Sequence, residues 1–426
     1  MRPASPVPVA GPYDVVPGPA LLAGTAEGPG LAAHRDRHGP LPDLDLDTLL
    51  DLTTRARVRG RGGAGFPFAT KLRAAAGRRR PVVVVNAGEG EPASAKDAAL
   101  VGAAPHLVLD GAVTTARALG AREVHLVLPG ERPDVAAALR FAARERDDRL
   151  RVHAHVADAR FVAGQETAVL ELLAGRPGFP VTAWQPASVA GHRRRPTVLS
   201  NAETWAHVGL LAHRGVAGYA RHGTDREPGT TLLTLAVRGR RATVREVPYG
   251  ARLRDVLPPE AWGQPALLGG FHGSWVTWET LASLRVSVDR LRALGTPLGA
   301  GVVLVPAPGE CPLRLTSRIV DYLAGQSAGR CGPCLNGLPA LASALRAVAA
   351  GSGRTDRLTA LAGLVERRGA CAHPDGTARL ARSLLAALLG EVDAHLRGGC
   401  PALAGTALGA PTRRLHAVPA APEGAA

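Results

Sequence analysis

The sequence is poor in lysine, asparagine and aromatic residues. Its 426 residues include only two lysines, Lys71 and Lys96, and three asparagines, Asn86, Asn201 and Asn336. Arginine supplies almost all of the positive charge, and the formal net charge is +15. Because the arginines are scattered, and six phenylalanines and four tyrosines offer few stacking surfaces, we expect no nucleic-acid partner. Where a residue type is this rare, its remaining positions are worth inspecting.

Long apolar runs are also missing. No stretch approaches the roughly 20 apolar residues of a membrane-spanning helix, and the N-terminus lacks the continuous apolar segment of a secretory signal. Five cysteines, an odd number without regular spacing, suit metal ligation in a reducing compartment better than disulfides. We therefore expect a cytoplasmic protein, peripheral to a membrane at most, with two or three packed domains.

Three of the few cysteines form a recognisable pattern. Cys331-Gly-Pro-Cys334 is followed after a long gap by Cys371. Glycines and Pro333 break the helical pattern here and leave the backbone free to present sulfur. Thiolates at this spacing can hold zinc or an iron–sulfur cluster. The alternative interpretation is that these thiols pack as small apolar side chains.

A dense glycine segment, Gly60-Arg-Gly-Gly-Ala-Gly-Phe-Pro67, formally contains G-x-G-x-x-G. A dinucleotide fingerprint follows a strand, whereas leucine spacing predicts a helix over residues 44–58 before this segment, so the ordinary Rossmann interpretation fails. Glycines nevertheless let backbone N–H groups approach an anion, and Arg61 and Lys71 add charge beside them. Both a phosphate cradle and a flexible turn are compatible with this segment.

The middle of the chain alternates strands and helices. Residues 81–86 predict a buried strand, with further strands at 124–128 and 150–156 and helices at 97–119 and 133–146. This alternation predicts a mainly parallel sheet. Ligands bind at the carboxyl ends of such strands, which is where Asn86-Ala-Gly-Glu-Gly-Glu-Pro92 lies.

The two ends of the chain differ from its middle. Residues 1–40 are rich in proline and glycine and predict a loosely held arm. Residues 232–237 and 244–247 predict a small β-rich module with a helix at 253–257, and residues 312–396 predict a helical bundle that holds the cysteines.

Five motifs occur in a recognisable order: the segment 60–67 with Lys71, the segment 86–92 with Lys96-Asp97, Gly164-Gln-Glu-Thr167, Ser200-Asn-Ala-Glu-Thr204 and the cysteine segment. Together they resemble the NADH-binding flavoprotein subunit of respiratory complex I and its relatives in hydrogenases and formate dehydrogenases. The resemblance covers roughly residues 45–395. It implies an α/β fold with a Rossmann-like FMN domain, a small β-grasp (SLBB-like) module and a C-terminal helical-bundle iron–sulfur domain. The expected boundaries are an N-terminal arm at 1–43, the FMN/NAD-binding α/β domain at 44–225, the β-grasp module at 226–300, the iron–sulfur domain at 301–405 and a disordered tail at 406–426.

The resemblance also implies roles for individual residues. The phosphates of FMN and the dinucleotide would lie against Gly60, Arg61, Gly62, Gly63 and Lys71. Flavin would contact Asn86 and Glu89, with Gly164 and Gln165 beside it, and Glu166 would be the catalytic residue that faces the nicotinamide. The remaining cofactor positions would be Phe66 at the adenine and Ser200, Asn201 and Thr204 at the FMN phosphate, while Cys331, Cys334 and Cys371 would ligate iron.

Several positions depart from the family's pattern. The first cluster ligand is replaced by Ala328, and neither Cys311 nor Cys400 is an obvious substitute. A 3Fe-4S cluster, a 4Fe-4S cluster with another donor on one corner, or an empty site would each fit three thiolates. In the nucleotide pocket Gln165 and Gly88 replace acids, and Ala74 and Pro186 replace aromatic residues that clamp adenine. Each lost stacking contact costs roughly 0.5–1.5 kcal/mol, so we expect weaker NADH binding or a different donor.

The expected function is therefore that of a flavoprotein oxidoreductase. It would take hydride from NAD(P)H onto FMN and pass single electrons to an iron–sulfur centre and a ferredoxin-like or two-iron partner subunit. Two alternatives stay open: an FMN/iron–sulfur electron-transfer or assembly protein that does not oxidise NADH, and a catalytically silent scaffold.

Overall fold

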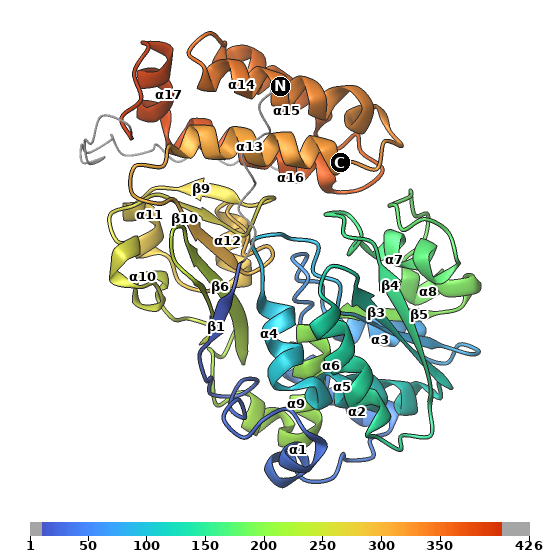
Figure 1. Cartoon of the computed structure of the whole chain (residues 1–426). Coiled ribbons are helices and arrows are strands. Elements are labelled where there is room, and N and C mark those ends of the chain that lie inside the picture. Colours follow the sequence, from blue (N-terminus) through green and yellow to red (C-terminus); the bar gives the residue numbers. More distant parts are fainter. Residues whose placement is uncertain (1–10, 403–426) are drawn as a thin grey trace, which may run out of the picture.

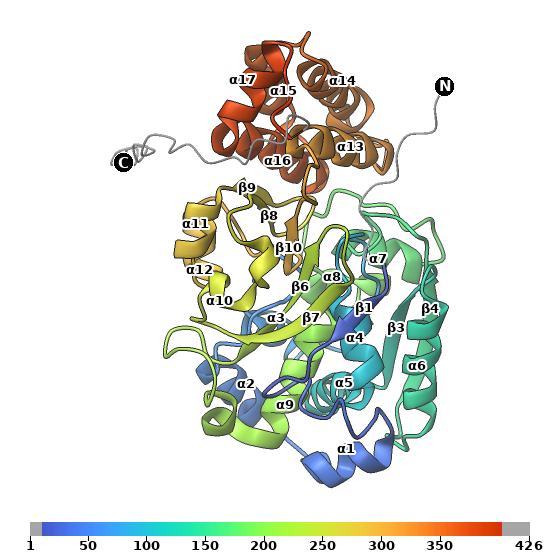
Figure 2. The same ribbon diagram turned by 60° about the vertical axis from the view of Figure 1, so that its left-hand side comes forward.

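A computed structural model describes residues 11–402, which form three packed regions (Figure 1). An α/β domain and a β-rich module lie side by side, and a helical domain covers one end of both. The turned view in Figure 2 shows the same arrangement. The predicted tail at 406–426 and the first ten residues of the predicted arm lie outside the described residues.

The α/β domain is built on a four-stranded parallel sheet in the order β4-β3-β2-β5. Its central strand β2 contributes Val83 and Val85 to a core on one face and Val82 and Val84 to a core on the other. Burial on both faces explains why this strand reads as an uninterrupted apolar run. The strands are β2 (Val82–Asn86), β3 (Glu123–Pro129), β4 (Arg151–Ala157) and β5 (Thr197–Asn201).

Helices cover both faces of this sheet. They are α2 (Leu46–Arg55), α3 (Phe68–Ala75), α4 (Lys96–Ala103), α5 (Pro105–Leu119), α6 (Pro133–Arg144), α7 (Glu166–Leu173), α8 (Ala187–Ala190) and α9 (Ala202–Tyr219). The single helix expected over 97–119 is two helices, α4 and α5, which meet at 92°. Pro105 causes the break, because a proline disfavours helical geometry at the residue before it, and Ala104 has a φ of −143°.

The β-rich module forms a six-stranded mixed sheet in the order β1-β7-β6-β10-β8-β9. Its strands are β6 (Thr230–Val237), β7 (Ala242–Pro248), β8 (Ala266–Leu268), β9 (Ser274–Val276), β10 (Val302–Val305) and β1 (Tyr13–Val15). The short helices α10 (Leu253–Val256), α11 (Trp278–Ser283) and α12 (Val288–Ala293) pack against it. Strand β10 belongs to this sheet although the sequence places it at the start of the helical domain.

The N-terminal segment differs from the loosely held arm that its composition predicts. Strand β1 pairs in parallel with β7, and helix α1 (Leu31–His38) follows it. Ala20, Leu21 and Leu22 are buried, and their N–H groups donate to the carboxylate of Glu246 over 2.8–3.0 Å. These partners are more than 220 residues away in sequence, so local composition could not indicate them.

The C-terminal region is helical, as predicted. It consists of α13 (Pro312–Gly325), a π-helical turn (Pro333–Gly337), α14 (Leu338–Ala349), α15 (Thr355–Val365), α16 (His373–Ala387) and α17 (Leu389–Leu396). Trp275 of β9 joins it to the β-rich module, because its indole N–H donates to Thr316 of α13 over 2.8 Å.

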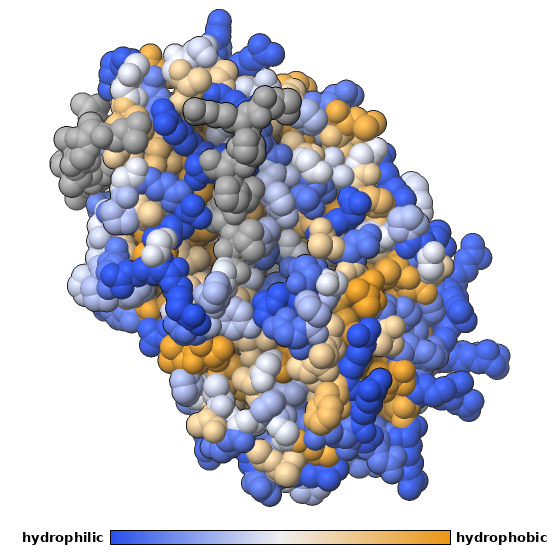
Figure 3. All heavy atoms as spheres, in the orientation of Figure 1, coloured by the Kyte–Doolittle hydropathy of each residue, from blue (hydrophilic) through white to orange (hydrophobic). Residues whose placement is uncertain are grey.

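The surface is dominated by hydrophilic residues. On the face shown in Figure 3, hydrophobic residues occur in separate patches between hydrophilic ones. Within residues 11–402, no single helix has the length and apolar character to cross a membrane, and only the bent pair α4–α5 passes that test jointly. Most residues of this pair are buried in the α/β core.

Candidate functional site

The glycine segment forms a closed loop between α2 and α3. Its base is a bridge between Arg59 and Pro67, and the N–H of Gly60 donates to the carbonyl of Phe66 over 2.8 Å. Gly63 and Gly65 have φ values of 99° and 58°, which glycine adopts without strain. A Cβ at Gly62 would meet only the Cβ of Asn201, at 4.0 Å. The loop therefore presents bare backbone to open space beside the strand ends.

A cavity of about 400 Å³ lies between this loop and the β-rich module, and it is partly open to solvent. Its walls come from the glycine loop, from α4 and α9, from β6, and from the segment that precedes β10. The lining residues that carry charge or a polar ring are Arg61, Lys96, Glu203, Tyr249 and Arg292.

The floor of this cavity is a network of buried charges. The ammonium of Lys96 lies 2.9 Å from carboxylate oxygens of both Asp97 and Glu203. Burial alone would raise the pKa of Glu203, but Lys96 and its other cationic neighbours hold this pKa well below its usual range. Arg61 lies 3.7 Å from Glu203 and over the Tyr249 ring, and its Nε atom is buried without a hydrogen-bond partner among residues 11–402. An unmatched buried donor beside a cavity is suited to an anionic group.

The carboxyl ends of β2 and β5 bring two of the three asparagines together. Asn86 and Asn201 are register partners in these neighbouring parallel strands. The Asn86 amide donates to the carbonyl of Gly164 over 2.9 Å, and its oxygen accepts from the N–H of Gly88. The hydroxyl of Thr204 donates to Asn201 and accepts from the N–H of Arg61 over 2.8 Å. These bonds tie the glycine loop to the strand ends. Ser200 directly precedes Asn201 in β5.

The predicted residues of α3 and α7 meet in an ion pair. The Lys71 ammonium lies 3.2 Å from Glu166 and donates to the carbonyl of Leu199 over 2.8 Å. The other Glu166 oxygen accepts from the N–H of Ala187 over 3.2 Å. Both side chains keep access to solvent, with 23% and 37% of their surfaces exposed. Phe66 is 46% exposed on the rim of the loop.

Glu89 has local partners that the sequence did not indicate. Its carboxylate accepts from the hydroxyl of Ser94 and from the N–H groups of Asp97 and Ala98 at the start of α4. Burial raises the pKa of Glu89, and nearby Asp97 adds to this effect. In this structure Glu89 therefore caps α4, and its predicted contact with flavin remains a prediction.

The three predicted metal ligands come together at the boundary of the α/β and helical domains. The Cys334 thiol donates to the Cys331 sulfur, and the N–H of Ala370 also donates to Cys331, which joins the two cysteine segments. Burial would raise the pKa of Cys331, but these hydrogen bonds outweigh it and lower the pKa. Burial raises the pKa of Cys334 to about 11, and it also raises the pKa of Cys371.

Gln165 connects the cysteines to the strand-end residues. Its side chain donates a hydrogen bond to the Cys371 sulfur, while the adjacent Glu166 pairs with Lys71 beside the glycine loop. The two residues at the start of α7 thus contact both halves of the predicted site. Sequence reasoning gave no role to Glu203 or Tyr249. The unusual survival of Lys96 was the only signal that pointed toward them.

The residues present fit the two groups that the sequence implies. Bare backbone at Gly62, the buried Arg61 and the strand-end asparagines suit a phosphorylated planar ligand. Three clustered thiols suit three corners of an iron–sulfur cluster, and Ala328 offers no donor for a fourth.

Known proteins share these regions. Residues 53–210 match the Nuo51 FMN-binding domain, and residues 314–395 match the NADH-ubiquinone oxidoreductase-F iron–sulfur binding region. The second F-type chain of NADH-quinone oxidoreductase from Rhizobium meliloti (strain 1021) is 31% identical over 73% of this chain and 79% of its own length. The F-type chain of the same enzyme from Streptomyces coelicolor (strain ATCC BAA-471 / A3(2) / M145) is also 31% identical, over 75% of this chain and 76% of its own length.

Solved structures agree with the sequence matches. A chain of an NAD⁺-reducing [NiFe]-hydrogenase in the H2-reduced state superposes with a TM-score of 0.78 at 26% identity, covering 90% of this chain and 68% of that chain. The predicted resemblance and the predicted fold class are thereby confirmed. The protein belongs to the family of F-type NADH-quinone oxidoreductase chains, which are FMN- and iron–sulfur-binding NADH oxidoreductases.

Proposed function

We propose that this protein takes hydride from NAD(P)H onto FMN and passes the electrons singly to an iron–sulfur centre and then to a ferredoxin-like or two-iron partner subunit. The observation that carries this proposal is the pair Gln165–Glu166. One side chain contacts a cluster cysteine, and its neighbour contacts the lysine beside the glycine loop. A donor site and a cluster site in such direct contact suit short-range electron transfer.

When bound, FMN accepts an electron pair as hydride and releases its electrons one at a time, as iron–sulfur centres require. The protein's part is binding and orientation. Backbone N–H groups of the glycine loop and the Lys71 ammonium would hold phosphate, since both present positive charge to the same open space. Asn86 and Asn201 would orient the ring, because their amides are fixed by hydrogen bonds at the strand ends.

Glu166 is the side chain that we assign to the nicotinamide. Its carboxylate is held from two sides, by Lys71 and by the N–H of Ala187, and 37% of its surface is open to solvent. A fixed and accessible carboxylate can accept a hydrogen bond from the carboxamide of an incoming nicotinamide. It would thereby select the ring orientation in which hydride faces the flavin.

The three thiols would hold the cluster as thiolates. Cys331 already has a lowered pKa, and binding of iron would draw the protons from Cys334 and Cys371. A 3Fe-4S cluster, or a 4Fe-4S cluster with a non-cysteine donor at the corner near Ala328, would fit this ligand set.

The test uses full-length protein that is purified and reconstituted with FMN and iron under anaerobic conditions. The flavin absorbance should bleach on addition of NADH or NADPH. Glu166→Gln should slow this bleaching and leave bleaching by dithionite unchanged, and Glu171→Gln, also on α7 but paired with Arg176 at the surface, should affect neither.

A second function is supported by the nucleotide pocket. Ala74 and Pro186 offer no aromatic face for adenine, which favours a flavin and iron–sulfur carrier that does not oxidise NADH. Bleaching by dithionite but by neither nicotinamide would establish this second function in place of the first. Failure to bind FMN at all would contradict both.

A further inference from the structure

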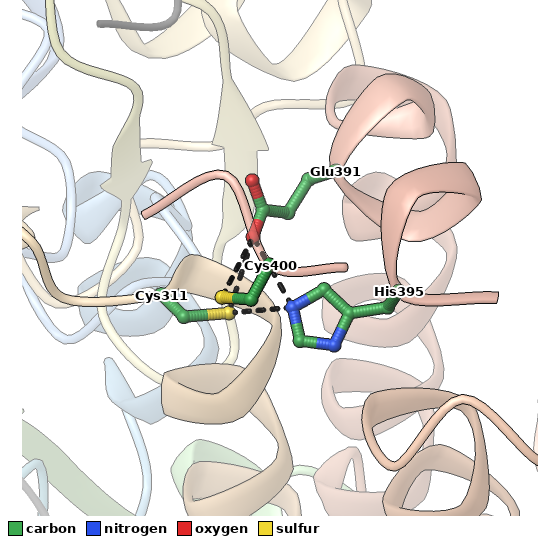
Figure 4. A group of neighbouring side chains, drawn as sticks. All are labelled: Cys311, Glu391, His395 and Cys400. Carbon is green, nitrogen blue, oxygen red and sulfur yellow. Dashed lines mark hydrogen bonds and ion pairs between the residues drawn. The ribbon is translucent and has the colours of Figure 1, made fainter. Parts of the chain in front are cut away.

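Four metal-binding side chains meet inside the helical domain, away from the predicted cluster (Figure 4). Cys311 lies at the start of α13, Glu391 and His395 lie one turn apart on α17, and Cys400 lies just after α17. One ligand atom from each residue lies within 4.8 Å of all the others. Glu391 and His395 have side chains that are 1% and 3% exposed, and Cys311 is also buried.

The distances between these atoms match a tetrahedral zinc site. Cys311 Sγ lies 3.2 Å from both Glu391 Oε1 and His395 Nε2, and these two atoms lie 3.3 Å apart. Cys400 Sγ lies 3.9 Å from Glu391 Oε1. Bonds of about 2.0–2.3 Å to a tetrahedral zinc ion place neighbouring donor atoms roughly 3.3–3.8 Å apart. The four side chains already have this spacing and point toward a common centre (Figure 4).

The surroundings prepare the histidine and one cysteine for a cation. His395 Nδ1 lies 2.8 Å from the carbonyl of Ala349, a partner that requires the ring proton on Nδ1 and leaves the Nε2 lone pair facing the cluster. The N–H of Arg314 donates to Cys311 Sγ, and the sulfur caps the N-terminus of α13, where negative charge is stabilised.

The carboxylate of Glu391 is left without a full set of partners. Its Oε2 atom is buried and has no hydrogen-bond partner among residues 11–402, and its only ion pair within them is with His395. A buried carboxylate needs a cation or several donors to offset its lost hydration. A divalent metal would supply that charge.

We propose that Cys311, Glu391, His395 and Cys400 bind a structural zinc ion. Two thiolates, one imidazole and one carboxylate form a mixed soft and borderline donor set, which suits Zn²⁺ better than Mg²⁺ or Ca²⁺. Four protein ligands leave no open position, so the ion fastens α17 and the following segment to α13 and takes no part in electron transfer. The site is separate from the cluster site, because the two cysteine groups lie beyond opposite ends of α13, a helix of 14 residues or about 20 Å.

The test is the metal content of the full-length protein, purified anaerobically with reductant. We expect about one zinc per chain in addition to iron. Cys400→Ser should lose most of the zinc and keep the iron and FMN. The matched variant Cys371→Ser should lose iron and keep the zinc. Because Cys400 follows the last helix, this variant should fold even if Cys311→Ser does not.

A second measurement uses Co²⁺ alone as the probe. Added to metal-stripped protein, Co²⁺ should give the intense thiolate-to-cobalt absorption of a tetrahedral site in wild type and in Cys371→Ser, and a much weaker band in Cys400→Ser. The proposal is overturned if the purified chain holds no zinc and gives no such band. It is equally overturned if zinc depends on Cys371 rather than Cys400, or if mass spectrometry finds a disulfide between Cys311 and Cys400 in the reduced preparation.

Discussion

Gly62 shows at the scale of one residue how a missing side chain can shape a binding site. Its φ is not in the left-handed region, and a Cβ there would meet only Asn201. Gly62→Ala should therefore leave the unfolding midpoint of the FMN-free protein almost unchanged. The added methyl would occupy space that we assign to FMN, so its Kd, measured by fluorescence titration, should rise about tenfold or more.

Gly102→Ala is the matched control for this variant. Gly102 lies in α4 with nothing within 4 Å of an added Cβ, so FMN binding should not change. If both variants bind FMN as tightly as wild type, the glycine loop is not the phosphate-binding wall.

Trp184 is the most exposed large hydrophobic residue within residues 11–402, with 93% of its surface open. It lies two residues before Pro186, the position at which the family's aromatic clamp is missing, and close to the Ala187 N–H that binds Glu166. If Trp184 stacks on the adenine of NADH, Trp184→Ala should raise the KM for NADH about two- to tenfold and leave kcat unchanged. Trp262→Ala, in the β-rich module, is the control, and an equal KM in all three proteins would exclude this stacking.

Glu91 provides a residue-scale prediction for pH. Burial raises its pKa to about 8, although N–H groups of Phe271 and Ala93 donate to its carboxylate. Between about pH 5 and 8 the folded protein holds a proton here that the unfolded chain has lost. The free energy of unfolding should therefore fall as pH rises through this range and level off above it, by on the order of 1 kcal/mol or more.

The measurement is urea unfolding at about pH 6 and pH 9 in wild type and Glu91→Gln. The glutamine cannot ionise, so the variant should lose less stability between the two pH values. Glu279→Gln, on the exposed face of α11, should behave like wild type. The same pH dependence in all three proteins would show that Glu91 ionises normally.

At the scale of secondary-structure elements, Glu246 of β7 fixes the N-terminal segment. Its carboxylate accepts from the N–H groups of residues 20–22 and from the hydroxyl of Thr230 over 2.6 Å. Glu246→Gln would turn an amide N–H₂ group toward these donors and should lower the free energy of unfolding by about 2–3 kcal/mol. Faster proteolysis within residues 11–45 should accompany this loss in limited digestion.

Glu260→Gln is the control for this prediction. Glu260 pairs with Arg240 at the surface, so its substitution should change stability by less than about 1 kcal/mol. An equally small effect of Glu246→Gln would mean that the N-terminal segment is held by β1 and α1 rather than by this carboxylate.

Elements with a strong local pattern were predictable from the sequence, whereas those held by distant partners were not. The run of valines in residues 82–85 identified β2, and leucine and alanine spacing identified the helical domain. The burial of Ala20, Leu21 and Leu22 depends on Glu246, and no local pattern predicts a partner that far away. Pro105 did mark a helix boundary, and the expectation of one helix over 97–119 gave it too little weight.

The same distinction holds for the candidate site. Composition alone singled out Lys71, Asn86 and Asn201, and the structure brings all three to the ends of neighbouring strands. Cys311 and Cys400 are 89 positions apart and belong to no motif, so only the fold reveals that they meet around Glu391. Side-chain roles such as the capping of α4 by Glu89 also depend on packing that a motif does not specify.

At the scale of the whole molecule, the net charge of +15 bears on the choice of electron acceptor. An arginine-rich surface attracts an acidic carrier over a distance of about one Debye length, which is roughly 10 Å at 0.1 M salt. Attraction of this kind speeds the encounter of the two proteins, and salt weakens it. A ferredoxin-like partner with an acidic surface would therefore receive electrons in a reaction that depends steeply on salt.

The rate of reduction of an acidic two-iron ferredoxin by the reconstituted, reduced protein should fall about tenfold between roughly 20 mM and 300 mM NaCl. Reduction of an uncharged quinone by the same preparation is the control, and it should change little because no charge steers that encounter. A ferredoxin rate that rises with salt, or that follows the quinone rate, would mean that the basic surface repels or ignores acidic carriers. The acceptor would then be a neutral or basic protein that docks through apolar contacts.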